Sequence, residues 1–359
     1  MFSAARRDSR SAAVPLRAPA LVDSLGGDYP LLAIVGPTAS GKSALALTLA
    51  ERLEGEIINC DSVQVYRGFD VGTGKVPPEG RRGIPHHLVD AVEPGELFTA
   101  GDYRRAALRV LAGVRERGKL PVVVGGTGLY LRALLLGLFE GPERSEDLRM
   151  RLRALAERRG RAFLHRLLRR FDQEAAERIH AHDTPKIIRA LEVRLLARQP
   201  LSSLLARGRV GLKGFRVFKV GLDPDRKQLA QRINARVQHM FAAGLVEEAR
   251  AMLARPSAAS IKPLGALGYR QACALLRGES SLEEAVRETQ GATRRYAKRQ
   301  MTWFRRETDI TWFAGFGDEP ETERQVLGWL RQVWLAGAAP AARTASPSSP
   351  REPFDGDKV

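Results

Sequence analysis

The chain has 359 residues, 44% of them hydrophobic, which is enough to bury a core spread over two or three domains' worth of sequence. No apolar run approaches the roughly 18 to 20 residues that cross a bilayer, so we expect no membrane span. The formal net charge of +17 favours a polyanionic partner, and two distant cysteines, Cys60 and Cys273, exclude a disulfide framework and a zinc finger.

Strands and helices are predicted to alternate in the first part of the chain. The first 28 residues combine Arg with Ser and Ala and are expected to be disordered. Because the strands that follow are uninterrupted apolar runs, they predict a parallel sheet covered on both faces. We expect strands at 31–35, 56–59 and 121–124, and helices at 43–53, 103–118 and 128–138.

The segment 140–209 breaks this alternation. It has no strand pattern and carries Arg-rich amphipathic helices, so we predict an all-helical insertion. The strand FRVFKVGLD at 215–223 then returns the chain to the sheet. A long helix over 281–308 follows, with a capping box predicted from Ser281 and Glu284. The tail at 338–359 is low in complexity and is expected to be disordered.

The stretch GPTASGKS at 36–43 lies between the first strand and the first helix and matches the phosphate-loop (P-loop) pattern. Backbone N–H groups of such a loop can cradle a di- or triphosphate. The fold class is therefore α/β, a P-loop NTPase-like parallel sheet core (29–139 and 210–337) with an all-helical insertion domain and C-terminal helices. We predict that Lys42 supplies charge and Ser43 a ligand for Mg²⁺. The predicted diphosphate-binding residues are Gly36, Pro37, Thr38, Ala39, Ser40, Gly41, Lys42 and Ser43.

Most P-loop enzymes act on the terminal phosphate of a nucleotide and place a carboxylate at the end of another strand. Here the strand at 121–124 ends in GGTG, whereas Asp61 directly follows the second strand. Because ligands bind at the carboxyl ends of parallel strands, Asp61 and Thr127 are both expected to face the loop. An Asp61 that caps a helix or is solvated is the alternative. No guanine or adenine signature is present, so the loop can hold a diphosphate that is not part of a nucleotide.

Eight blocks in chain order resemble the tRNA dimethylallyltransferase family. Together they span about residues 31 to 313, and their order makes the resemblance specific. They are GPTASGKS at 36–43, DSVQVYRGFDVGTGK at 61–75, PHHLVD at 85–90, VVVGGTGLY at 122–130, IIRALEV at 187–193, GLVEE at 244–248, LGYRQ at 267–271 and ATRRYAKRQMTWFR at 292–305.

The resemblance implies prenyl transfer. The exocyclic amine of the adenine 3′-adjacent to the anticodon, in tRNAs reading codons that begin with U, would attack dimethylallyl diphosphate, and diphosphate would leave. By similarity to the family, Asp61 would be the catalytic base, Thr127 would position the amine, and Thr38 with Lys42 would contact the diphosphate near the breaking bond. The implied partners are the tRNA anticodon stem-loop and dimethylallyl diphosphate, and the implied cofactor is Mg²⁺.

The family's tRNA-contacting segments also map onto this chain. In these segments the chain differs from the family pattern at two places. It has Gly265 where Arg or Gln is common, and Pro185 with Lys186 where Gln and Arg are common. Arg232 and Arg236 are spaced four apart, and either could reach the diphosphate or pair with a neighbouring helix. The implied tRNA-binding residues are Asp61, Ser62, Val63, Gln64, Thr127, Arg149, Lys186, Arg189, Arg270, Lys298, Arg299 and Arg305.

Two other functions stay open at this stage. One is a small-molecule kinase that transfers phosphate from ATP, and the other is a basic RNA-binding protein that uses the loop only to sense nucleotide. The missing carboxylate after 121–124 and the eight ordered blocks count against both. We expect a bacterial-type, cytoplasmic enzyme that acts as a monomer.

Overall fold

The computed structural model describes residues 17–256 and 258–335, which divide into two compact units. The sheet unit comprises the described residues of 17–99, 105–128 and 214–335. The helical unit comprises 100–104 and 129–213. The expectations for residues 1–16 and for the tail at 338–359 lie outside the described residues.

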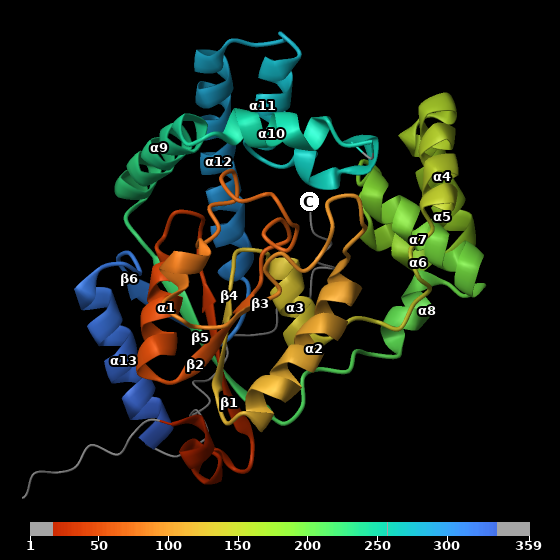
Figure 1. Cartoon of the computed structure of the whole chain (residues 1–359). Helices are drawn as coiled ribbons and strands as arrows, with labels where there is room; N and C mark the ends of the chain where they lie inside the picture. Colours follow the sequence, from red (N-terminus) through yellow and green to blue (C-terminus); the bar gives the residue numbers. More distant parts are fainter. Residues whose placement is uncertain (1–16, 257, 336–359) are drawn as a thin grey trace, which may run out of the picture. The chain divides into compact units, whose positions relative to one another are not determined.

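The sheet unit is built on one parallel six-stranded sheet (Figure 1). Its strand order is β3-β2-β4-β1-β5-β6, and every neighbouring pair is parallel. The predicted α/β class is confirmed, and two strands that the sequence pattern did not predict, β3 and β6, flank the sheet. The strands are β1 (Tyr29–Val35), β2 (Gly55–Asn59), β3 (His86–His87), β4 (Leu120–Val124), β5 (Phe215–Asp223) and β6 (Ile310–Ala314).

Three of the four inner strands, β1, β2 and β4, are buried along their whole length, because both faces of the sheet are covered there. On one face, Leu32 and Ile34 of β1 pack in a core cluster with Leu45 and Leu49 of α1 (Lys42–Arg52). The same cluster contains Trp334 of α13 (Pro320–Leu335). Apolar side chains on both faces therefore produce the continuous apolar runs of these strands.

Residues 17–28 correct the expectation of an entirely disordered start. They form two short 3-10 helices, η1 (Ala18–Leu21) and η2 (Asp23–Leu25). Ala18, Leu21 and Leu25 are buried in the cluster that holds Trp334. Three apolar residues within eight positions are thus enough to dock this segment, a signal hidden by the surrounding Ser, Ala and Arg.

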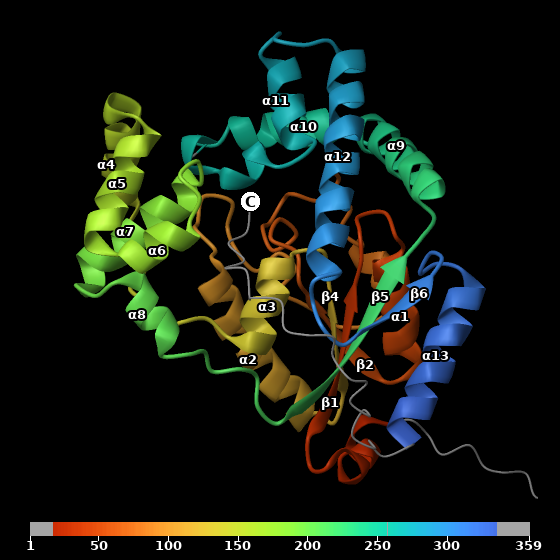
Figure 2. The ribbon, with the colours of Figure 1, turned by 180° about the vertical axis from the view of Figure 1, so that it is seen from behind.

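Further helices of the sheet unit gather beyond the carboxyl ends of the strands, as Figure 2 shows for α9 to α12. The long helix α12 begins at the predicted capping box, in which Ser281 and Glu284 each receive a hydrogen bond from the other residue's backbone. These helices are α9 (Arg226–Ala242), α10 (Leu245–Leu253), α11 (Tyr269–Leu276) and α12 (Leu282–Phe304). Short 3-10 helices lie in two connections: η3 (Pro78–Arg81) between β2 and β3, and η4 (Ala258–Ser260) and η5 (Lys262–Gly265) between α10 and α11.

The helical unit has helices and no strand among its described residues. Its core brings Leu152, Leu164, Leu168, Ile187 and Leu191 together. It starts earlier than the predicted position 140, because residues 129–136 and 100–104 group with it. Its helices are α4 (Glu146–Arg159), α5 (Arg161–Phe171), α6 (Gln173–Arg178), α7 (Thr184–Ala197) and α8 (Leu201–Ala206). Two further helices, α2 (Ala100–Glu116) and α3 (Gly128–Leu136), contribute residues to both units. No helix within the described ranges is long and apolar enough to cross a bilayer.

Candidate active site

The phosphate loop, residues 36–43, connects β1 to α1 as predicted. A turn after β6 braces its outer side, since the Gly317 N–H donates to the Ser40 carbonyl at 2.9 Å. Gly41 has a φ of +81°, and a Cβ there would lie between 2.6 and 2.8 Å from atoms of Asp318 and Gly317. Only glycine fits this position, so the loop's shape is set before any ligand arrives.

Lys42 opens α1, and its Nζ donates to the Pro37 carbonyl at 3.1 Å, which folds the ammonium back over the loop. Desolvation, with Arg236 as a second cause, lowers the pKa of Lys42 to about 8, and the carboxylate of Asp61 acts in the opposite direction. Burial likewise lowers the pKa of Arg236, opposed by Asp61. Arg236 and Asp61 therefore both act electrostatically on Lys42 at the loop, in opposite directions.

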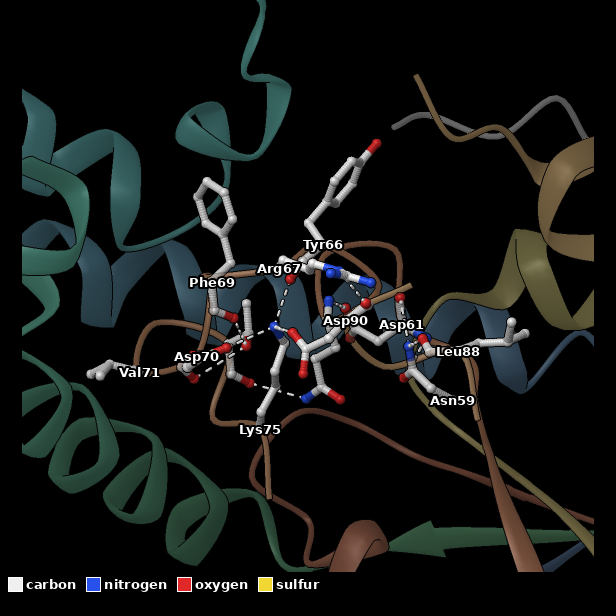
Figure 3. A network of polar contacts seen from close by, with 12 residues as sticks. Asn59, Asp61, Tyr66, Arg67, Phe69, Asp70, Val71, Lys75, Leu88 and Asp90 are labelled. Atoms are coloured by element: carbon white, nitrogen blue, oxygen red, sulfur yellow. Dashed lines mark hydrogen bonds and ion pairs between the residues drawn. The ribbon is translucent and has the colours of Figure 1, made fainter. Parts of the chain in front are cut away.

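Asp61 follows β2, at the carboxyl edge of the sheet. Its Oδ1 accepts the backbone N–H groups of Val63 at 2.9 Å and Gln64 at 3.3 Å. The Asn59 side chain connects the backbone at Asp61 to the backbone at Leu88. Its Oδ1 accepts from the Asp61 N–H, and its Nδ2 donates to the Leu88 carbonyl at 2.9 Å (Figure 3). Oδ2 of Asp61 makes no hydrogen bond within the described residues and is left to accept one from a ligand.

Thr127 lies in the loop after β4, and it connects the ends of two strands. Its Oγ1 accepts the Ser62 N–H at 3.0 Å, and its own N–H donates to the Cys60 carbonyl at 3.2 Å. Asp61 stands between these two residues in sequence. The structure thus brings the two predicted strand-end residues together.

Gln300 on α12 was not predicted, and it connects the phosphate loop to the loop after β4. The residue is 5% exposed; its Oε1 accepts the Thr38 N–H at 2.8 Å, and its Nε2 donates to the Gly126 carbonyl at 2.9 Å. One turn earlier lies Tyr296, whose pKa is raised by burial and by Asp61. In RRYAKRQ, Tyr296 and Gln300 are spaced i to i+4, which places them on one face of the helix and could have indicated Gln300. From the sequence, only the basic residues between them were considered.

The structure separates the two arginine candidates of α9. Arg232 binds both carboxylate oxygens of Asp318, at 2.6 and 2.8 Å, and its guanidinium lies 3.6 Å from the centre of the Phe316 ring. Arg236 donates to the Thr73 carbonyl at 3.1 Å and acts electrostatically on Lys42. Of this pair, Arg236 is therefore the arginine that acts on the lysine of the phosphate loop.

The remaining predicted tRNA contacts of the sheet unit differ in availability. Arg270 at the start of α11 and Lys298 and Arg299 on α12 are exposed, and Arg299 lies 5.6 Å from the Tyr296 ring centre. Arg305 is exposed as well but forms an ion pair with Asp223 at 2.9 Å. Exposed cations without a competing carboxylate are the better placed to meet phosphates.

In the helical unit, the three predicted tRNA contacts are held in ion pairs. Glu192, fully buried, binds Arg149 at 3.0 Å and Arg189 at 2.8 Å. Lys186 pairs with Asp183 at 2.7 Å. Arg149 is only 11% exposed in its side chain, so its first role is to neutralise the buried glutamate.

Comparison with known proteins identifies a family and relatives that share this sequence. Residues 64–307 match the family model described as IPP transferase. The tRNA dimethylallyltransferase of Solibacter usitatus is 56% identical over 298 residues, which cover 83% of this chain and 97% of the relative. That of Koribacter versatilis is 55% identical and covers 81% and 95%.

A solved structure agrees with these sequence matches. The tRNA isopentenylpyrophosphate transferase of Bacillus halodurans has a TM-score of 0.62 at 36% identity, and the match covers 86% of this chain and 97% of that one. A eukaryotic dimethylallyltransferase has a TM-score of 0.73 at 24% identity, over 88% and 82%, and supports the fold. On this evidence the chain belongs to the IPP transferase family, that of the bacterial tRNA dimethylallyltransferases.

Proposed function

We propose that this chain transfers a dimethylallyl group from dimethylallyl diphosphate to the exocyclic amine of the adenine 3′-adjacent to the anticodon, in tRNAs that read codons beginning with U. The names of its bacterial relatives support the reaction and the tRNA substrate. The proposal depends on one observation: Arg236 and Asp61 both act on Lys42 of the phosphate loop, at a sheet edge where β4 is followed by Gly125 and Gly126 and not by a carboxylate.

The phosphate loop suits a leaving group. As the allylic C–O bond breaks, negative charge grows on the diphosphate oxygens, and fixed donors stabilise this state more than the ground state. The backbone N–H groups of 36–43 supply such donors, with positive charge from Lys42 and Arg236. No phosphoryl group needs to move, which accounts for the absence of a catalytic carboxylate at the end of β4.

The donor atoms near Ser43 fit a magnesium ion shared with the substrate. Ser43 lines a small pocket that is partly open to solvent, together with Asn59 and Gln64. Within residues 17–256 and 258–335, no group of three or more His, Cys, Asp and Glu side chains could hold a metal. Mg²⁺ commonly keeps several waters and binds through few protein oxygens plus substrate phosphates, so Ser43 would hold it. When bound, the ion would neutralise charge on the departing diphosphate.

Asp61 suits the role of base. The lone pair of an adenine amine is delocalised into the ring, so a carboxylate must orient the amine and accept its proton as the N–C bond forms. Oδ1 is occupied by two backbone N–H groups, which leaves Oδ2 for the amine. In the balanced reaction the N–C bond forms, the C–O bond breaks, diphosphate leaves and the proton passes to Asp61.

The tRNA would be held by exposed cations of the sheet unit, Arg270, Lys298 and Arg299. The adenine must leave its stack to reach a site at the sheet edge, which single-stranded loop nucleotides do at low cost. The proposal also places the enzyme in the cytoplasm, acting as a monomer.

The test incubates the protein and Mg²⁺ with unmodified tRNA, adding labelled dimethylallyl diphosphate in one reaction and γ-labelled ATP in another. We expect label in tRNA from the prenyl donor alone. Asp61→Asn should lower the rate by about 10² to 10⁴, the range of general-base catalysis, with tRNA affinity retained. The exposed Glu283→Gln is the control. Loss of the terminal phosphate of ATP with no prenyl label in tRNA would instead favour a kinase or a nucleotide sensor.

A further inference from the structure

The loop at 69–75 lies between Asp61 and α9 and carries the sequence FDVGTGK, whose role the reaction above does not explain. It has no regular secondary structure, yet polar contacts fix it along its length (Figure 3). The Lys75 side chain, 4% exposed, anchors one end: its Nζ donates to the Tyr66 carbonyl at 2.6 Å and pairs with Asp70 at 2.7 Å and Asp90 at 2.5 Å.

Glu248 of α10 holds the backbone in the middle of this loop. Its Oε2 accepts the N–H groups of Asp70 and Val71, both at 2.9 Å, and its Oε1 lies 3.5 Å from the N–H of Gly72. A carboxylate that accepts several backbone N–H groups is a strong, directional anchor. These contacts reach across 176 or more residues of sequence, so they cannot arise from local turn formation.

Tyr269 of α11 completes the anchor. It is fully buried, and its hydroxyl group donates to Glu248 Oε1. The Tyr269 hydroxyl oxygen in turn accepts the Gly72 N–H at 3.1 Å. Burial and the neighbouring carboxylate raise the pKa of Tyr269, so the phenol keeps the proton that it donates. A Cβ at Gly72 would lie 2.5 Å from the Tyr269 ring, which explains the first glycine of VGTG.

The next two residues of the loop contact Arg236. The Thr73 carbonyl accepts from Arg236 at 3.1 Å and from Gln64 Nε2 at 3.2 Å. Gly74 has a φ of +60°, and a Cβ there would lie 2.2 Å from Arg236 Nη2, which explains the second glycine. The loop therefore presents an acceptor and an open space to one guanidinium, which in turn acts on Lys42.

We propose that Glu248 and Tyr269 are positioning residues for Arg236: by anchoring the backbone at 70–72 they fix the Thr73 carbonyl and hold the guanidinium ready for the diphosphate. Neither residue touches the reacting atoms. The inference rests on the proposed function in taking diphosphate as the ligand. It explains why two glycines and a distant Glu–Tyr pair accompany one arginine.

The experiment measures the binding of inorganic diphosphate, in buffer with MgCl₂ and without tRNA, by calorimetry on the full chain. Glu248→Gln is expected to weaken binding about tenfold and Tyr269→Phe, which removes only the hydroxyl, by about three- to tenfold. Glu247→Gln, one position away, exposed and paired only loosely with Arg250 at 3.7 Å, is the matched control and should bind as the wild type does. Because no prenyl transfer is measured, the result stands apart from the outcome of the transferase assay.

A double-mutant cycle separates positioning from general support of the fold. In an Arg236→Ala background, Glu248→Gln and Tyr269→Phe should have little further effect, since the group that they position is gone. A melting scan of each variant accompanies the titration, and if Glu248→Gln fails to fold, the conclusion rests on Tyr269→Phe. Wild-type affinity in that variant, or an equal loss with and without Arg236, would overturn the proposal.

Discussion

The Lys42 ammonium lies among groups that shift its pKa in opposite directions. Desolvation and Arg236 lower the pKa to about 8, and Asp61 opposes them. A bound diphosphate would add negative charge and favour the protonated form. The free protein and the complex therefore differ in proton count near pH 8, which makes donor binding dependent on pH.

We predict that the affinity for dimethylallyl diphosphate, measured without tRNA, changes little between pH 7 and 8 and falls as pH rises above 8, by up to tenfold per unit. The reason is that above pH 8 the free protein must take up a proton on Lys42 to bind the anion. Unliganded stability should change the other way, rising with pH between about 8 and the usual lysine value, because the unfolded chain binds the extra proton there.

Lys42→Arg provides the control, because a guanidinium stays charged throughout this range. Its donor affinity should be lower than that of the wild type and flat from pH 7 to 10. A wild-type affinity that does not change between these limits would show that Lys42 is not the titrating group.

Gly74 gives a second prediction at this scale. Gly74→Ala should weaken diphosphate binding about tenfold or more, because the new methyl group would displace the Arg236 guanidinium. Gly83→Ala is a close control: Gly83 has a similar φ of +72° and nothing within 4 Å, so that substitution brings the backbone strain without the clash. Equal diphosphate affinity in the two variants would contradict the placement of Arg236.

At the scale of elements, α12 connects two loops of the candidate site. Gln300 accepts a hydrogen bond from Thr38 in the phosphate loop and donates one to Gly126 in the loop after β4. A Cβ at Gly126 would lie 2.0 Å from Gln300 Nε2, and one at Gly128 would lie 2.1 Å from Trp303 Nε1. The glycines of GGTG thus let α12 approach the sheet edge closely.

We predict that Gln300→Met, which keeps the length of the side chain and removes both hydrogen bonds, costs about 1 to 3 kcal/mol of stability for the groups left unpaired. The rate of transfer should fall more than substrate affinity, since the distance between donor and acceptor loops is no longer fixed. Urea unfolding and single-turnover rates measure the two effects. Thr302→Ala, exposed on the same helix, should change neither. A Gln300→Met enzyme with a normal rate would exclude this role.

For the whole molecule, the net charge of +17 is the most general property relevant to tRNA. Each phosphate contact releases counterions, so the salt dependence of tRNA affinity counts such contacts. Lys298→Ala or Arg299→Ala should each lower the slope of log affinity against log salt by about 0.7 to 0.9. Arg331→Ala removes an exposed charge from α13 and should leave the slope as it is. If all three variants had the wild-type slope, Lys298 and Arg299 of α12 would not contact tRNA phosphates.

The sequence predicted the local features of the site well. Gly36 and Lys42 lie between β1 and α1, and Asp61 follows β2, as predicted. These positions were predictable because a phosphate loop and a strand end are short-range sequence patterns. Gln300 and Glu248 were missed, since each acts on a backbone more than 170 residues away. Arg236 could not be separated from Arg232 by spacing alone; Asp318, after β6, made the difference.

The fold divides in the same way. The buried strands β1, β2 and β4 follow from continuous apolar runs, whereas β3 has only two residues, His86 and His87, and no pattern to detect. The docking of η1 and η2 needed the partners that β1 and α13, respectively, supply. Arg149 and Arg189 were selected as tRNA contacts by resemblance, but their pairing with buried Glu192 depends on how α4 and α7 pack.

The most direct test of the account measures, in one reaction with wild-type protein, the diphosphate released from dimethylallyl diphosphate and the prenylated adenosine formed in tRNA. Diphosphate would be quantified enzymatically, and the nucleoside by mass spectrometry after digestion. We predict equal amounts of the two products, no orthophosphate, and neither product above background when the adenine next to the anticodon is replaced by guanine. Orthophosphate in place of diphosphate, or diphosphate release that does not depend on that adenine, would contradict it.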